Sequence, residues 1–148
     1  MNLFSTSPIG HHYGLAFIRI IVGVFMVYHG SEVFDHEKMD AYLQWDQFKN
    51  SSAATKVYTG KIIELVGGIL LTAGFCTRLA ALLIAVTMFY ISFFVGTGKI
   101  WYEDQHPFMF VLLALVFFFI GPGKYSLDHY FRNNHMRVVK QNWKECIK

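Results

Sequence analysis

The stretch from Gly60 to Arg78 constrains the fold more than any other part of the sequence. It is long enough to cross a bilayer and it is apolar almost throughout. It nevertheless carries a carboxylate, Glu64. A charged side chain in hydrocarbon costs at least about 2.5–3.5 kcal/mol, so Glu64 should face protein or a wet cavity rather than lipid. We therefore expect this stretch to be the central helix of a small membrane protein.

The small residues of this stretch predict which side of the helix packs. Positions three and four residues apart share one face of a helix, and this places Gly60, Glu64, Gly67 and Gly68 together. Small side chains allow a second backbone to come close. We therefore predict that Gly60, Gly67 and Gly68 are helix-packing positions and that an ionisable group lies on the same face.

Apolar residues occur in long blocks throughout the chain, which has 148 residues, 54% of them hydrophobic and 16% charged. This pattern predicts a single membrane domain, 1–148, with an all-α fold: an integral membrane four-helix bundle. Pro107 suits the first turn of the last helix, and the glycines of 121–123 suit its end. The predicted spans are 14–34, 58–75, 79–97 and 107–120.

Two segments outside the spans also show helical patterns. The connection 35–57 predicts a short amphipathic helix at the membrane interface. The tail 124–148 is basic and aromatic, and Ser126 can cap a helix there. Such a tail is expected to rest on anionic lipid, although docking to a protein and disorder stay open. The excess of Lys and Arg in the tail predicts that both termini are cytoplasmic.

Ionisable side chains within the spans are candidates for function. At about 1.5 Å of rise per residue, His29 and Glu64 lie within about two helical turns of each other in depth. They could share a proton or face a quinone headgroup, they could form a structural pair that fixes helix register, or they could fail to meet. Arg19 could pair with Asp128 or with Glu64, and Arg78 could reach lipid headgroups.

Several functional classes find no support in the sequence. It has no P-loop, no GxGxxG and no Cys/His cluster of the zinc type, so no metal is expected. A formal charge of +3 is too small to suggest nucleic acid. No haem is expected either, because His106 is placed in a polar loop before Pro107 and no second buried histidine accompanies His29.

An ordered set of motifs resembles the DoxX family of small bacterial four-helix membrane proteins. The resemblance covers about residues 14–128 and ends on the segment GPGKYSLD. The residues that carry it are Arg19, His29-Gly30, Glu64-Leu65-Val66-Gly67-Gly68, Thr77-Arg78 and Gly121-Pro122-Gly123-Lys124-Tyr125-Ser126-Leu127-Asp128.

The resemblance implies a multi-pass protein of the bacterial cytoplasmic (inner) membrane that associates with quinone-linked redox complexes. The implied function is an integral membrane subunit or accessory protein of a quinone-linked oxidoreductase, with quinone as the cofactor. His29 and Glu64 would contact the headgroup or its proton, while Arg19, Arg78 and Asp128 would lock the cytoplasmic end. The chain has no evident redox centre, so electrons must come from elsewhere. Its partners would be membrane lipids and other protein subunits.

Two other functions are compatible with the same residues. One is a non-catalytic assembly, chaperone or scaffold protein of another membrane complex, in which Glu64 and His29 fix helix register. The other is a small transporter, which is less favoured because four short helices with few polar positions offer little of a translocation path.

Overall fold

Every element that the structure describes is a helix. The computed structural model describes residues 10–45, 48 and 53–146, and this part of the chain contains no strand. The all-α class is therefore confirmed for the described residues, whereas Lys148 of the basic tail lies outside them. The elements in order are α1 (His11–Gly30), the 3-10 turn η1 (Ser31–Phe34), α2 (His36–Leu43), α3 (Ala53–Ala73), α4 (Thr77–Tyr90), the π-helical turn η3 (Ile91–Val95), α5 (Gln105–Ile120) and α6 (Leu127–Cys146).

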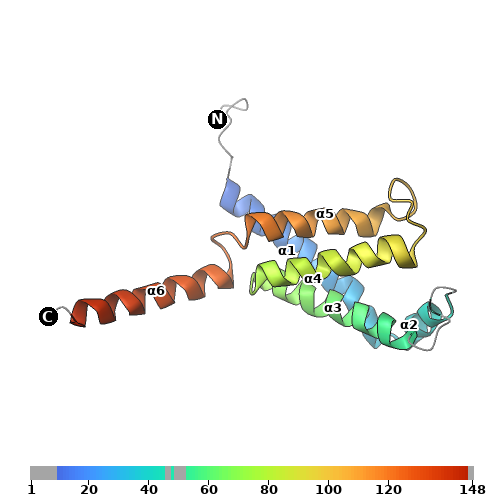
Figure 1. Cartoon of the computed structure of the whole chain (residues 1–148), viewed down its shortest axis with the longest axis horizontal. Helices are drawn as coiled ribbons and strands as arrows, with labels where there is room; N and C mark the ends of the chain where they lie inside the picture. The colour runs from blue at the N-terminus through green and yellow to red at the C-terminus, as the bar shows by residue number, and fades with distance from the viewer. Residues whose placement is uncertain (1–9, 46–47, 49–52, 147–148) are drawn as a thin grey trace, which may run out of the picture.

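Four of these helices pack on one another in chain order (Figure 1): α1 on α3, α3 on α4, and α4 on α5. The first and last of the four, α1 and α5, touch each other far less. The buried side chains between the helices are almost all apolar, with Met26, Leu71, Ile84 and Phe117 among the largest. A smaller apolar cluster around Met39 seats α2 against the first part of α3 and the turn η3.

The helix bounds differ from the predicted spans mainly at the start of α3. This helix begins at Ala53, whereas the hydropathy pattern predicted a start at Tyr58. Hydropathy marks where apolar residues begin, but alanine and lysine continue a helix well beyond that point. The expected short helix in the first connection is present as α2. Pro107 lies in the first turn of α5, which ends at Ile120 as predicted.

Large hydrophobic side chains cover the outside of the packed helices. Phe17 is 66% exposed, Val86 60% and Phe119 73%, and many neighbours are similar. Soluble proteins rarely expose apolar patches of this extent. Two described helices are long and apolar enough to cross a membrane, namely His12–Phe34 and Thr77–Val95. Together these features indicate a membrane protein.

The two ends of the packed helices differ. At one end, the start of α1 and the α3–α4 turn meet the segment that leads into α6, where the rings of Tyr13 and Tyr125 stack at 4.7 Å. From there α6 runs away from the four helices, roughly along their direction (Figure 1). The hydroxyl oxygen of Ser126 accepts a hydrogen bond from the backbone N–H of His129, so the predicted cap is confirmed. Contact of α6 with lipid stays a prediction.

Glycines allow α1 and α3 to approach very closely. A Cβ added at Gly68 would lie 2.6 Å from the backbone nitrogen of Val27 and 2.8 Å from the carbonyl oxygen of Gly23. A Cβ at Gly67 would lie 3.0 Å from Ile84 of α4. At Gly60, in contrast, a Cβ would meet no described atom within 4 Å. The packing role predicted for Gly60 is therefore wrong, because this residue borders a cavity rather than a helix.

The connection between η3 and α5 is held together by one carboxylate. Asp104 is 9% exposed, and its Oδ2 accepts hydrogen bonds from the backbone N–H and the hydroxyl of Thr97, each at 2.8 Å, and from the N–H of Lys99 at 3.2 Å. Burial by itself would raise the pKa of Asp104, but these hydrogen bonds outweigh it and lower the pKa below 3.8, its ordinary value.

Two glycine variants should have opposite effects on stability. Gly68→Ala forces α1 and α3 apart, so we expect it to lower the free energy of unfolding by about 1–3 kcal/mol. Gly60→Ala, on the same helix, adds helix propensity without a clash and should be neutral or stabilising by up to about 1 kcal/mol. Thermal unfolding of both variants in one detergent measures the difference. Equal losses would contradict the packing described here.

The Asp104 carboxylate should make stability depend on acid. Because its pKa is lower in the folded protein, its contribution is fully present above pH 3.8 and is lost as the pH falls through the folded pKa. The melting temperature should therefore drop below about pH 4 in an acid-tolerant detergent. At neutral pH, Asp104→Asn should have a free energy of unfolding about 1–2 kcal/mol lower than that of the native protein. Its stability should also fall less on acidification. Parallel pH profiles for the two proteins would refute this.

Candidate functional site

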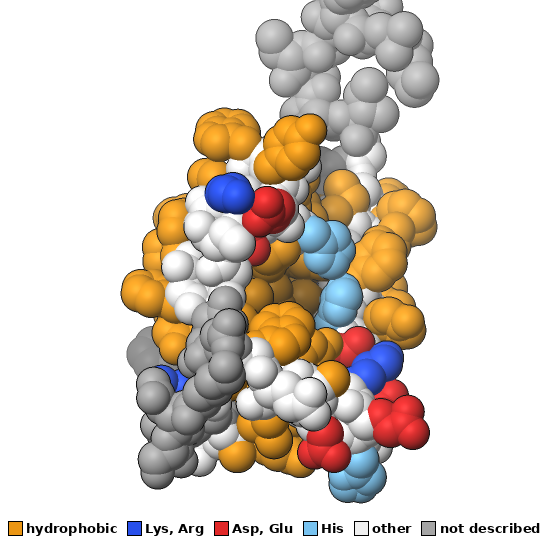
Figure 2. Space-filling view, turned by 90° about the vertical axis from the view of Figure 1, so that its right-hand side faces the viewer, with side chains coloured by type: hydrophobic (Ala, Val, Ile, Leu, Met, Phe, Trp, Pro, Cys, Tyr) orange, Lys and Arg blue, Asp and Glu red, His pale blue; other side chains and the backbone are white. Residues whose placement is uncertain are grey.

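A cavity of about 240 Å³ opens at the end of the molecule that α2 covers. Figure 2 shows this end, where two histidines border a hollow with hydrophobic side chains at its base. Most of the wall is apolar, with charged groups gathered on one side. The π-helical turn η3 contributes to the wall, and such turns are frequent at functional sites. The lining residues include His29, Tyr42, Trp45, Phe48, Val57, Gly60, Lys61, Glu64, Met88, Ile91, Val95, His106, Pro107 and Phe110.

Lys61 joins two carboxylates at the charged side of the cavity. Its Nζ lies 2.8 Å from Glu32 Oε2 and 3.1 Å from Glu64 Oε2, and it also donates a hydrogen bond to the carbonyl oxygen of His29 at 3.3 Å. The three ionisable side chains are mostly buried, with Lys61 13%, Glu32 14% and Glu64 3% exposed. The expectation that Glu64 faces protein rather than lipid is thus confirmed.

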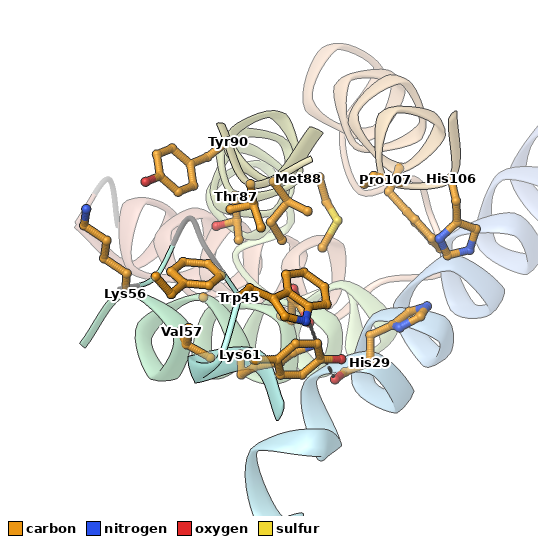
Figure 3. Close-up of a pocket in the computed structure, with 17 residues that line it drawn as sticks. His29, Trp45, Lys56, Val57, Lys61, Thr87, Met88, Tyr90, His106 and Pro107 are labelled. Atoms are coloured by element: carbon orange, nitrogen blue, oxygen red, sulfur yellow. Dashed lines mark hydrogen bonds and ion pairs between the residues drawn. The ribbon is translucent and has the colours of Figure 1, made fainter. Parts of the chain in front are cut away.

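Aromatic residues from α2 and the residues after it cover this ion-pair group. The hydroxyl of Tyr42 donates a hydrogen bond to Glu32 at 2.8 Å, and Lys61 Nζ lies 5.0 Å from the centre of the Tyr42 ring. Burial, followed by the hydrogen bond to Glu32, raises the pKa of Tyr42 above 10.0. The Trp45 ring packs edge-on against Tyr42 at 5.2 Å and lies across the cavity in Figure 3.

Two histidines from different helices meet beside the cavity. The rings of His29 and His106 lie 5.3 Å apart, edge to face, and Figure 3 shows both on the same side of the cavity. Phe110 packs against them, at 5.1 Å from the His106 ring and 6.1 Å from the His29 ring. The prediction that His106 belongs to a polar loop is wrong, because α5 begins before it, at Gln105. Proline is tolerated in a first helical turn, because the N–H groups there have no intrahelical partner, so the helix can begin two residues before Pro107.

His29 and Glu64 border the same cavity but engage different partners. Glu64 is paired with Lys61, and the neighbours of the His29 ring are aromatic: Tyr28, His106 and Phe110. Among the described residues no hydrogen bond joins His29 to Glu64. The sequence contains one signal for the actual partner, since Lys61 lies three residues before Glu64 and therefore on the same helix face.

The site offers hydrogen-bond donors rather than a metal cage. In the described part of the chain, no group of three or more His, Cys, Asp or Glu side chains is placed to hold a metal ion. The two imidazoles can donate to a carbonyl oxygen and can also accept a proton, whereas the three N–H groups of Lys61 are already engaged by Glu32, Glu64 and the His29 carbonyl. The apolar wall can hold a flat, uncharged ring against Trp45 and Phe110.

The other predicted polar residues gather at the opposite end of the helices. Asp128 accepts hydrogen bonds from the N–H groups of Cys76 (2.7 Å) and Thr77 (2.9 Å), which are the unpaired donors at the start of α4. A carboxylate at this position also complements the helix dipole. The backbone N–H of Asp128 in turn donates to the carbonyl of Gly74 at 3.0 Å, so the α3–α4 turn and the first turn of α6 hold each other.

Arg19 lies beside this contact and is 1% exposed. Its Nη2 donates a hydrogen bond to the carbonyl oxygen of Tyr125 at 2.6 Å, whereas Glu64, one of its two expected partners, is engaged elsewhere. A Cβ at Gly74 would collide with the guanidinium, and the φ of Gly74 is +69°, so only glycine suits this position. Arg78 lies in the first turn of α4, beside the backbone of Gly121.

Comparison with known proteins identifies the family of the chain. The family model for DoxX matches residues 14–97. The chain belongs to the DoxX family. An uncharacterised protein of Haemophilus influenzae is 31% identical over 126 residues, which cover 80% of this chain and 91% of that protein. No solved structure matches the chain. Within this DoxX protein the matched region runs from the first turn of α1 to just beyond η3, and it therefore contains Arg19, His29 and the whole Lys61 ion-pair group.

Removing Lys61 should destabilise the protein strongly. Lys61→Met leaves two mostly buried carboxylates without their shared cation, so we expect a loss of about 3–5 kcal/mol in the free energy of unfolding. Lys38→Met is the matched control, because Lys38 also contacts Glu32, at 3.3 Å, but is 48% exposed. It should cost less than about 1 kcal/mol. Denaturation in detergent measures both, and similar losses would show that burial of the Lys61 group is unimportant.

Proposed function

We propose that this DoxX protein is an integral membrane subunit, or accessory protein, of a quinone-linked oxidoreductase and that its cavity holds the quinone headgroup. It would span the bacterial cytoplasmic membrane with α1, α3, α4 and α5, and its basic tail favours cytoplasmic termini. Family membership and the outward-facing apolar side chains support the membrane setting.

The observation that carries the proposal is the composition of the cavity wall. A quinone ring is flat and uncharged, and its two carbonyl oxygens accept hydrogen bonds. The cavity provides apolar and aromatic surface for such a ring, from Trp45 and Phe110, and its lining includes the imidazoles of His29 and His106, which can donate hydrogen bonds. Binding sites of this kind are mostly apolar, with a few polar groups that fix orientation.

A bound quinone would accept or deliver electrons together with protons. The chain would orient the ring and manage its protons, while electrons come from a partner subunit. An imidazole titrates near neutral pH, so His29 and His106 are the groups suited to exchange a proton with a ring oxygen. Lys61 uses its three N–H groups on Glu32, Glu64 and the His29 carbonyl, so it would balance the two carboxylates beside the ring rather than bind the ring itself.

Filling the cavity should abolish quinone binding without unfolding the protein. Gly60 borders the cavity and a Cβ there meets no described atom within 4 Å, so Gly60→Leu inserts a side chain into the free space. We expect affinity for a short-chain benzoquinone, measured by titration calorimetry in detergent, to fall by at least about tenfold. Val66→Leu is the control, because Val66 lies on the same helix, is 47% exposed and does not border the cavity. Unchanged affinity in Gly60→Leu, or no binding to the native protein, would refute the proposal.

The second candidate is an assembly or scaffold protein of another membrane complex. It is favoured by α6, which leaves the four helices and exposes Tyr130, Phe131 and Met136 without a described partner helix. Glu64→Gln separates the two functions, because it removes a charge from the cavity and leaves α6 unchanged. Loss of complex assembly with normal quinone affinity would favour the scaffold; loss of affinity with intact assembly would favour the quinone site.

A further inference from the structure

We infer that the ligand of the cavity is a tailed, lipid-soluble quinone whose tail lies in the groove between α1 and α5. This inference rests on the proposed function and adds the route by which the ligand enters. The groove has a volume of about 340 Å³ and is lined by α1 between Ile18 and Phe25 and by α5 between His106 and Leu113. Its lining side chains are apolar except for His106.

The groove exists because α1 and α5 are the outer members of the row of four helices. α1 is drawn onto α3 by the close contact at Gly23 and Gly68, and α5 packs on α4. The two outer helices therefore meet only loosely, and the seam between them stays open. The side chains that border it are partly exposed, with Ile18 at 49% and Met109 at 47%.

The groove and the cavity meet at shared side chains. His106 and Phe110 line both, and the His29 ring lies 5.3 Å from His106 on the cavity side. A molecule with its polar ring beside His29 and Lys61 would therefore have its next atoms at the end of the α1–α5 groove. The two shared side chains place the groove next to the cavity, and the inference requires that a ligand pass between them.

The volumes favour a ligand that is divided between the two spaces. The cavity, at about 240 Å³, is smaller than the roughly 300–1,000 Å³ of pockets that enclose a drug-sized ligand. A ring fits, but a long tail must leave. The apolar groove offers a surface for isoprenoid units, which lose nothing by leaving similarly apolar lipid.

A phospholipid is a poorer occupant of the groove. A phosphate needs a cation, but the ammonium nearest to the junction, Lys61, is already paired with Glu32 and Glu64. Lys56 also borders the cavity, but Figure 3 shows its side chain directed away from the histidines. The charges of the described residues at the junction therefore favour a neutral headgroup.

The test compares two ligands and two neighbouring variants. Ile21→Trp fills the groove from a half-exposed position of α1, whereas Ile20→Trp places the same bulk on a position that does not line it. The probes are a decyl-tailed benzoquinone and the same ring with a methyl group in place of the tail. Affinities are measured in one detergent, and each variant is compared with the native protein for the same ligand, so that partition into detergent cancels.

We expect Ile21→Trp to weaken binding of the tailed quinone by about tenfold and to change binding of the tail-less ring by less than about twofold. Ile20→Trp should change neither. If the native protein binds neither ligand, the proposed function fails and this inference fails with it. If both ligands bind but Ile21→Trp affects neither, or affects both equally, the groove inference is overturned and the headgroup site stands.

A second measurement on the native chain avoids any effect of the substitutions on folding. A quinone with a diazirine at the end of its tail is bound and irradiated, and the labelled peptides are identified by mass spectrometry. Labels on residues 18–25 and 106–113 support the inference. Labels confined to the exposed faces of α3 or α4, or displacement of the probe by phospholipid alone, overturn it.

Discussion

The bridge that Lys61 makes between Glu32 and Glu64 is the interaction on which the α2-covered end of this structure depends. Each carboxylate would be costly in an apolar setting, and the shared ammonium offsets both. Because Glu32 lies in η1 and Glu64 in α3, the bridge also fixes where α1 ends against α3. Tyr42 then attaches α2 to the same carboxylate. The wall and the cover of the cavity thus share one electrostatic centre, which is strengthened by the low dielectric around it.

Uneven packing among the four helices produces the space around that centre. Glycines bring α1 and α3 into backbone contact at Gly23 and Gly68, so no room remains between them. Gly60 lies two turns before Gly68 on the same helix, yet it faces free volume. The tight contact pulls α1 away from α5, and the looser seam follows from it. The helices α1 and α3 are therefore in close contact, whereas the seam between α1 and α5 stays open.

Local patterns predicted the helices well, and the site only in part. The cost of a bare carboxylate in lipid was enough to predict that Glu64 is sheltered. Its partner Lys61 was not predicted, because sequence gives the order of charges but not which of them turn inward. Gly60 and Gly67 lie only about 20° apart on a helical wheel, and a wheel cannot show that a Cβ at Gly67 would meet Ile84 while one at Gly60 would meet no described atom. His106 was placed in a loop because hydropathy does not indicate that α5 begins before its apolar block.

The contact between α6 and the rest of the chain has a mechanical consequence. Asp128 holds the start of α4 through two backbone N–H groups, and the neighbouring Tyr125 carbonyl holds Arg19 of α1. The element α6, Leu127–Cys146, is one continuous helix that begins at this joint. A displacement of the first turn of α6 would therefore act on the start of α4 through Asp128 and on the third turn of α1 through Arg19. The tail is thus joined to both α1 and α4 at the α3–α4 turn.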